Sequence, residues 1–207
     1  MKLKLAEPEA HIAGVDPAFA AIIEVAGTFA PRPPEADSFN TLAASIIFQQ
    51  LAGRAARAIH GRFLALYDGH ATADAILRTS PDDLRRVGLS GNKAVSILDL
   101  ASKTSDGTVP LAELEQLPDD EVVQRLTAVR GIGRWTAEMF MIFHLRRLDV
   151  WPVDDFGVRK GYAAIHGLPE APKPKELDLL GEIYRPYRSV AAWYCWRAVD
   201  TVLPAIP

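Results

Sequence analysis

The sequence of 207 residues predicts an all-α protein. Apolar residues recur at spacings of three and four along most of the chain, and no stretch alternates apolar and polar residues for long enough to form a convincing strand. Helix starts are also well marked. At Asp16-Pro17 and Ser80-Pro81 a capping side chain precedes a proline at the first helical position.

The expected elements follow in order. Residues 1–15 look irregular, a helix runs from Asp16 to about Gly27, and Pro31, Pro33 and Pro34 then form a stiff connection. Asp37 or Ser38 caps the next helix, which ends near 48–51. Further helices are expected at about 52–67, 72–77, 80–87, 91–104, 118–128, 134–146, 155–166, 175–184 and 187–201. An extended segment at 147–153 and a loop at 169–174 interrupt them.

The composition is that of an ordinary globular protein with one or two small domains. No apolar run approaches the roughly 20 residues of a membrane span, and the start of the chain does not resemble a signal peptide. The single cysteine, Cys195, excludes an internal disulfide and a four-cysteine zinc or iron–sulfur site. We therefore expect a cytoplasmic protein with no membrane partner.

The net charge of −3 is not typical of a nucleic-acid-binding protein. The distribution is more informative, because basic residues outnumber acidic ones from Arg130 to Arg197 while acidic residues dominate before Arg130. A modest basic surface on the C-terminal half is compatible with this pattern. Charge alone does not decide the partner.

A glycine turn, Gly131-Ile132-Gly133, lies between two segments with helical spacing. Two glycines can take positive φ and bring bare backbone to a surface, and the helix that follows has unpaired first-turn N–H groups. Such a helix start favours a phosphate. Arg130 and Arg134 flank the turn and Thr136 adds a hydroxyl. The alternative is an ordinary helix-glycine-helix corner.

A second stretch, 87–94, resembles this turn. Val87-Gly88-Leu89-Ser90 and Arg130-Gly131-Ile132-Gly133 are both followed, four residues after their last member, by an alanine, Ala94 or Ala137. The similarity indicates either a degenerate internal repeat or two short glycine turns that match by chance.

The paired carboxylates Asp154-Asp155 follow the extended segment. We expect Asp154 to cap the next helix and Asp155 to lie in its first turn. An Asp155 that faced a cleft could stabilise positive charge or activate a water molecule.

Five aromatic residues could form either core or a stacking pocket: Trp135, Trp151, Trp193, Tyr194 and Trp196. A π face also attracts a cation by about 0.5–2 kcal/mol. The sequence leaves both readings open for Trp135, in the first turn after the glycines, and for Trp193 and Trp196, three residues apart on one helix.

Taken together, these segments resemble the helix-hairpin-helix DNA glycosylases, and within them the 3-methyladenine DNA glycosylase II family. The family hairpin is similar to the stretch from Leu126 to Phe140, and the family segment with the catalytic aspartate is similar to the stretch from Val153 to Arg159. The loop that wedges into DNA is similar to the stretch from Ile46 to Leu51. The C-terminal helix of the family is similar to the stretch from Arg188 to Arg197. The resemblance covers residues 37–200.

The resemblance implies a two-lobed helical bundle with a cleft. One lobe would span 38–146, with the wedge loop and the hairpin, and the other 1–37 plus 147–207, with the catalytic aspartate. Some family members begin with a β-rich domain. About 36 residues precede the first family helix here and they indicate a helix and a proline loop, so we expect that domain to be missing.

The resemblance also implies roles for individual residues. Asp155 matches the catalytic aspartate, and Gln50 with Leu51 matches the wedge that fills the gap left by the extracted base. The expected phosphate contacts are Gly131, Gly133, Arg134 and Thr136. The expected base pocket is lined by Trp135, Trp196 and Met139. The carbonyls of Thr127, Val129 and Gly131 match positions that coordinate a structural monovalent cation such as Na⁺ or K⁺; no other cofactor is expected.

Two departures from relatives indicate a monofunctional enzyme. Bifunctional relatives carry a nucleophilic lysine where this chain has Trp135, and without an amine no Schiff base forms. The four-cysteine cluster of endonuclease-III-like relatives is also missing. We therefore predict a monomeric glycosylase that removes 3-methyladenine and 7-methylguanine type bases from double-stranded DNA. The alternatives are a glycosylase for other damaged bases, a non-catalytic hairpin module that binds DNA, and a plain helical scaffold.

Overall fold

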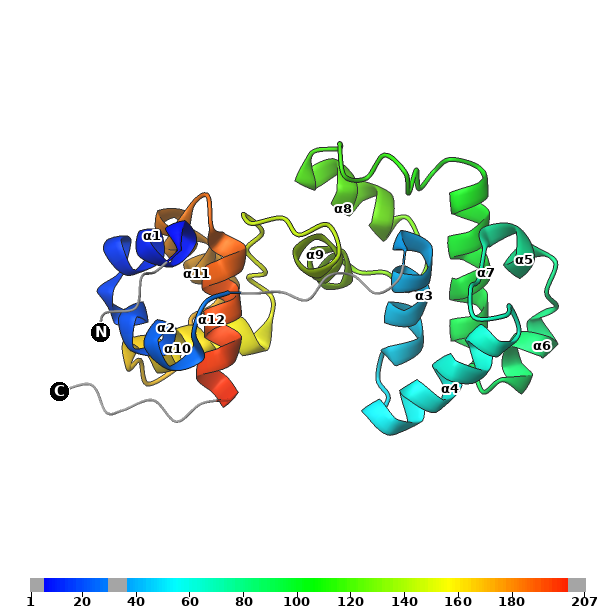
Figure 1. Ribbon diagram of the computed structural model, residues 1–207, viewed down its shortest axis with the longest axis horizontal. Helices are drawn as coiled ribbons and strands as arrows, with labels where there is room; N and C mark the ends of the chain where they lie inside the picture. Colours follow the sequence, from blue (N-terminus) through cyan, green and yellow to red (C-terminus); the bar gives the residue numbers. More distant parts are fainter. Residues whose placement is uncertain (1–5, 30–36, 201–207) are drawn as a thin grey trace. The chain divides into compact units, whose positions relative to one another are not determined.

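The computed structural model describes residues 6–29 and 37–200, and every regular element within these ranges is a helix (Figure 1). The all-α prediction is therefore confirmed. The chain divides into two compact units, Met1–Arg32 with Arg146–Pro207 (unit 1) and Pro33–Leu145 (unit 2). In the described ranges no helix combines the length and the apolarity that crossing a membrane would need. The expected proline connection at 31–34 lies outside the described residues.

Unit 1 is built around the pair α10 (Phe156–His166) and α12 (Arg188–Asp200). The other elements are α1 (Glu7–Val15), η1 (Pro17–Phe19), α2 (Ala20–Ala26), α11 (Pro174–Gly181) and η2 (Glu182–Tyr184). Phe19, Tyr184 and Tyr194 are among its largest fully buried side chains. A Cβ on Gly161 would lie 1.8 Å from the carbonyl oxygen of Cys195, so only glycine allows the two central helices to approach this closely.

The prediction that residues 1–15 are irregular is wrong, because α1 spans Glu7–Val15. This helix has no side-chain cap at its start, so the usual local signal is missing. Tertiary contacts hold it instead: Ile12 is fully buried, and Glu9 Oε1 accepts a 2.7 Å hydrogen bond from the Phe29 amide. The expected helix from Asp16 also begins differently, as a 3₁₀ turn capped by the Asp16 carboxylate.

Unit 2 contains seven α-helices among its described residues, and α7 forms the central one. They are α3 (Ser38–Phe48), α4 (Gly53–Ala65), α5 (Ala73–Leu77), α6 (Pro81–Arg86), α7 (Gly91–Ser105), α8 (Asp119–Thr127) and α9 (Arg134–Phe143). The predicted caps Asp37, Thr72 and Ser80 all accept backbone hydrogen bonds at their helix starts. α9 ends at Phe143, three residues earlier than expected.

Candidate functional site

The hairpin between α8 and α9 has the backbone that the glycine turn predicted, with one correction. Gly131 has φ +82, and a Cβ there would lie 2.7 Å from Ser96 Oγ, so this position requires glycine. Gly133 has φ −93 and needs no left-handed backbone, so the expectation for two such glycines is wrong. Gly133 is the N-cap of α9 and provides no side-chain cap. No side chain therefore occupies the cap position in front of the first-turn N–H groups of α9.

The side chains around this hairpin are basic. Arg130 and Arg134 are exposed, and Arg134 Nε donates a 2.9 Å hydrogen bond to the buried Glu138 carboxylate. Thr136 is only 8 % exposed, which leaves its hydroxyl little access to an outside ligand. The positive end of α9 and two exposed guanidinium groups suit an anion such as a phosphate.

Side chains of α7 fix the turn from behind. Asp99 Oδ2 accepts hydrogen bonds of 2.7 Å from the Arg130 amide and from Lys103 Nζ. Lys103 Nζ also donates to the Ala128 carbonyl at 2.6 Å. Burial by itself would raise the pKa of Asp99, but the Arg130 amide and Lys103 outweigh it, so this pKa is lowered.

The carbonyls proposed for a monovalent cation lie in the same turn. The Val129 carbonyl accepts from the Ile132 amide at 3.1 Å, and the Gly131 carbonyl accepts from Gln49 Nε2 at 2.8 Å. Each carbonyl oxygen has two lone pairs, so these bonds leave room for a cation contact and the residues fit the group. Within the described ranges no cluster of His, Cys, Asp or Glu suits a metal ion.

The predicted wedge residues lie where α3 ends. Gln49 is the C-cap of α3, and Gln50 has φ +54, which is uncommon for a residue other than glycine. Gln50 is exposed and Leu51 is 37 % exposed. The loop therefore presents both side chains at the surface of unit 2.

The stretch 87–94 forms a second hairpin, between α6 and α7, in the same register as the first. Gly88 has φ +106 and lies three residues before the helix start, as Gly131 does. Leu89 and Ile132, the next residues, are both 4 % exposed. The similarity seen in the sequence is therefore matched by a repeated backbone.

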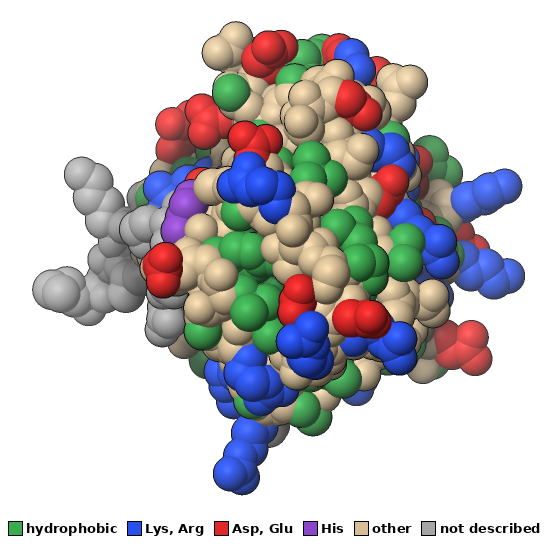
Figure 2. Space-filling view, turned by 90° about the vertical axis from the view of Figure 1, so that its right-hand side faces the viewer, with side chains coloured by type: hydrophobic (Ala, Val, Ile, Leu, Met, Phe, Trp, Pro, Cys, Tyr) green, Lys and Arg blue, Asp and Glu red, His purple; other side chains and the backbone are tan. Residues whose placement is uncertain are grey.

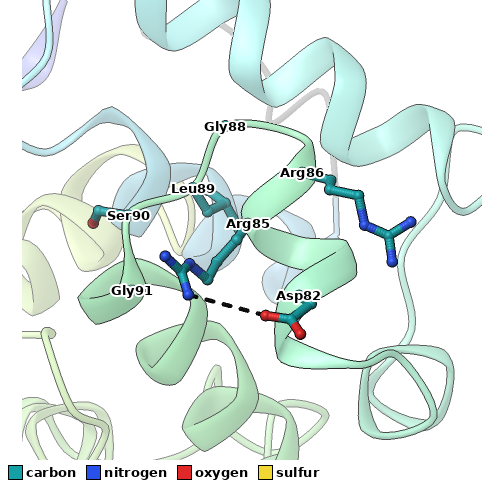
Figure 3. A pocket seen from close by; sticks show the side chains of 7 residues that line it. All are labelled: Asp82, Arg85, Arg86, Gly88, Leu89, Ser90 and Gly91. Atoms are coloured by element: carbon teal, nitrogen blue, oxygen red, sulfur yellow. Dashed lines mark ion pairs between the residues drawn. The ribbon is translucent and has the colours of Figure 1, made fainter.

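The surroundings of the second hairpin differ from those of the first. Ser90 caps α7 by accepting a hydrogen bond from the Lys93 amide. In the hollow beside it, Arg85 pairs with Asp82, and Arg86 points away from Ser90 (Figure 3). Arg86 pairs with Asp83. Figure 2, which looks onto unit 2 over α4 to α7, shows basic and acidic side chains interspersed. This face has no dominant positive patch.

In unit 1, Asp155 is the N-cap of α10 and is only 9 % exposed. Its Oδ1 accepts from the Val158 amide at 2.8 Å and from Trp196 Nε1 at 2.9 Å. The expectation that Asp154 caps this helix is therefore wrong. Asp154 lies in the turn that precedes the helix, and the Asp155 amide closes that turn on the Pro152 carbonyl at 3.0 Å.

Gly157 allows the Trp196 indole to reach Asp155. A Cβ on Gly157 would lie 2.9 Å from Trp196 Cδ1 and 3.1 Å from Asp155 Oδ1. Phe156 follows Asp155 directly and is 68 % exposed, so it is a further candidate for the site that the sequence analysis did not select. Its position directly after the candidate catalytic carboxylate is the sequence feature that could have identified it.

The other aromatic candidates separate into two groups. Trp151, Trp193 and Tyr194 are structural: Trp151 Nε1 donates to the Leu177 carbonyl, Trp193 packs on Phe29, and Tyr194 is fully buried. On α9, Trp135 is 49 % exposed and Met139 is partly exposed. The structure thus brings Asp155 and Trp196 into contact in unit 1, while Trp135 and Met139 share a helix of unit 2.

Residues 43–186 match the family model of the HhH-GPD superfamily of base excision DNA repair proteins. DNA-3-methyladenine glycosylase 1 of Schizosaccharomyces pombe is 34 % identical over 93 % of this chain and 87 % of its own length. The solved structure of the S. pombe 3-methyladenine DNA glycosylase Mag1, in complex with abasic DNA, superimposes with a TM-score of 0.83 over 95 % of this chain and 98 % of that one. The Bacillus halodurans DNA-3-methyladenine glycosidase, 36 % identical, gives 0.88 over 95 % and 90 %.

The chain therefore belongs to the helix-hairpin-helix superfamily of base excision repair glycosylases and, within it, to the 3-methyladenine DNA glycosylase family. The resemblance drawn from the hairpin, the aspartate segment and the wedge loop is confirmed at the level of family and fold.

Proposed function

We propose that the protein is a monofunctional DNA glycosylase that hydrolyses the N-glycosidic bond of alkylated purines in duplex DNA, as an early step of base excision repair. The observation that carries this proposal is the Asp155 carboxylate, nearly buried and fixed by two N–H donors at the start of α10. A carboxylate held in this way suits stabilisation of a developing positive charge.

DNA recognition begins at the hairpin. The uncapped start of α9, with Arg130 and Arg134, binds a backbone phosphate, which positions the duplex without reading its sequence. The target base must leave the stack to be reached. Gln50 and Leu51, exposed at the end of α3, fill the gap that the base leaves.

Alkylation makes the base a better leaving group. An N3- or N7-alkylated purine carries a positive charge and departs as a neutral base when the bond from the sugar C1′ to the base nitrogen breaks. Asp155 stabilises the sugar cation, helps a water molecule to add to C1′, or does both. The products are a free base and an abasic site, and no redox step occurs.

The base pocket is proposed to involve Trp135, Met139 and Trp196, whose aromatic faces favour a cationic base. Trp196 has an additional role, because its Nε1–H is bonded to Asp155. Trp196→Phe keeps an aromatic face and removes this donor. If the donor matters, the single-turnover rate constant falls while affinity for abasic DNA stays; if only stacking matters, the rate changes little.

Two further properties belong to the proposal. A monovalent cation on the carbonyls of Thr127, Val129 and Gly131 would add positive charge beneath the bound phosphate, and replacing K⁺ by a bulky organic cation at constant ionic strength would then weaken DNA binding. The protein acts as a monomer, which sedimentation velocity tests directly.

Asp155→Asn tests the central assignment. Asparagine is also a good N-cap, so α10 keeps its start while the negative charge is lost. We expect release of 7-methylguanine from duplex DNA to fall by about a hundredfold or more with nearly unchanged DNA affinity. Full activity in this variant would contradict the proposed mechanism. A panel of oxidised, deaminated and alkylated lesions separates the proposal from a glycosylase for other bases.

The proposed lack of strand cleavage has its own test. The family resemblance matches Trp135 with the nucleophilic lysine of bifunctional relatives, so no Schiff base should form. Borohydride added during turnover should trap no covalent protein–DNA adduct, and an adduct would show lyase activity.

A further inference from the structure

The loop that carries the wedge residues is held by hydrogen bonds from both hairpins of unit 2. Gln49 Nε2 donates to the Gly131 carbonyl in the α8–α9 hairpin at 2.8 Å. Lys93 Nζ, on the first turn of α7 behind the second hairpin, donates to the carbonyls of Ile47 at 2.8 Å and Gln49 at 2.7 Å. The backbone on each side of Gln49 is thereby tied down.

These bonds meet a physical need. Gln50 adopts φ +54, and a non-glycine residue keeps this left-handed conformation only when its surroundings impose it. The last carbonyls of α3 also have no partners within the helix, and the Lys93 ammonium satisfies two carbonyls at this end, where the helix dipole favours a positive charge.

We infer that Gln49 and Lys93 are positioning residues that couple the phosphate grip of the α8–α9 hairpin to the wedge, an inference that rests on the proposed glycosylase function. Gln49 bonds to the carbonyl of Gly131, the residue whose left-handed conformation shapes the hairpin. A duplex held by its phosphate at this hairpin therefore meets Gln50 and Leu51 at a fixed register. The second hairpin takes part by holding the loop through Lys93.

This coupling predicts a difference between the release rates of paired and unpaired lesions. The wedge matters when a paired base must be extruded and the gap kept open, and the cost of extrusion is least for a base with no partner. Loss of the coupling should therefore slow release of a paired lesion more than release of an unpaired one. A general defect in folding or in the chemistry at Asp155 would slow both equally.

The test uses the full chain with Gln49→Ala and Lys93→Met, and Gln116→Ala as the matched control, since Gln116 is exposed in the connection between α7 and α8. Single-turnover release of 7-methylguanine is measured opposite cytosine and opposite an abasic-site analogue. 2-Aminopurine next to the lesion reports unstacking by its fluorescence. We expect Gln49→Ala to slow the paired substrate about fivefold, the scale of one lost hydrogen bond, with the unpaired substrate and the control unchanged.

Each outcome is decisive. A rise of 2-aminopurine fluorescence that is slower or smaller in both variants supports the coupling. Equal losses on the two substrates, or none, overturn it. Thermal melting shows whether Lys93→Met still folds. If it does not, Gln49→Ala alone tests the coupling, because the hydrogen bond that it removes is exposed and its loss should not unfold the protein. If the wild type releases no base from either substrate, the proposed function itself has failed.

Discussion

The two hairpins of unit 2 share a backbone but differ at the position that caps the second helix. In the α8–α9 hairpin this position is Gly133, which offers no side chain to the first-turn N–H groups. In the α6–α7 hairpin it is Ser90, whose hydroxyl accepts from the Lys93 amide. Both turns carry exposed arginines with carboxylate partners: Arg85 and Arg86 pair with Asp82 and Asp83, and Arg134 pairs with Glu138. The cap is therefore the clearer difference between the two hairpins.

If a phosphate binds at the start of α9 as proposed, this difference indicates that the open cap is what makes one of two similar helix starts an anion site. The same left-handed glycine, buried apolar residue and helix start occur twice. In one copy they leave room for a phosphate, and in the other they are closed and the helix behind them holds the wedge loop through Lys93. Four measurements test this difference between the hairpins.

The largest effect should come from the two left-handed glycines. Gly131→Ala and Gly88→Ala both force alanine into positive φ, and we expect each to lower the free energy of unfolding by about 1–3 kcal/mol. Only Gly131→Ala should also weaken DNA binding by the folded protein, by about tenfold or more, because its Cβ would displace Ser96 next to the proposed phosphate site. Fluorescence anisotropy under conditions where both variants are folded measures this. Equal affinity losses would mean that both hairpins bind DNA.

The next effect is on the salt dependence of binding. Arg134→Ala removes a guanidinium that is 65 % exposed beside the proposed phosphate, although its Nε is bonded to Glu138, and should reduce the slope of log K against log salt by about 1. The double variant Arg85→Ala with Arg86→Ala removes two exposed charges beside the helix start that Ser90 caps, where we expect no phosphate, and should leave the slope unchanged. A lower slope in the double variant would assign a phosphate contact to the second hairpin.

A smaller effect should follow from exchanging the caps. A Cβ on Gly133 meets nothing within 4 Å, so Gly133→Ser fits, gains a few tenths of a kcal/mol in stability and competes with the phosphate for the first-turn N–H groups. DNA affinity should fall about threefold, a loss well under 1 kcal/mol. Ser90→Gly should lose a similar amount of stability with no change in affinity. Unchanged binding by Gly133→Ser would show that the open cap is not used.

The smallest effect concerns the carboxylate behind the first turn. The folded-state pKa of Asp99 is lowered, so this group stabilises the fold above its unfolded pKa of about 4, and the contribution disappears as pH falls through the folded value. Asp99→Asn should therefore lower the free energy of unfolding by less than about 1 kcal/mol at pH 7. Below about pH 4 the variant and the wild type should be equally stable. Urea unfolding at both pH values tests this. If the difference in unfolding free energy between the wild type and Asp99→Asn is the same at both pH values, Asp99 contributes through packing and hydrogen bonds and not through its charge.

The parts of the structure that could be predicted from the sequence are those fixed by residues close together in the chain. The caps at Asp37, Thr72 and Ser80 and the register of both hairpins follow from neighbouring residues, and so they were predictable. α1 lacks a side-chain cap and is held by residues far along the chain, so local rules missed it. The choice between Asp154 and Asp155 as cap depends on where the preceding turn closes, which residue types alone do not determine.

The same limit applies to the candidate site. The contact of Lys93 with Gln49 joins residues 44 positions apart, and that of Gln49 with Gly131 joins residues 82 apart. Neither has a local pattern that would reveal it. The bond from Trp196 to Asp155 depends on the space above Gly157, which appears only when α10 and α12 pack together.

Cys195 has a practical consequence. It is the lone cysteine of the chain, it is fully buried against α10, and burial, with the charges of Asp16 and Asp155, raises its pKa well above the usual value. A thiol kept protonated and covered reacts slowly with maleimides. A cysteine introduced at an exposed position can therefore be labelled selectively in the otherwise unaltered protein. A fluorophore or spin label attached beside Leu51 would then report whether the wedge loop stays fixed or shifts when a lesion is bound.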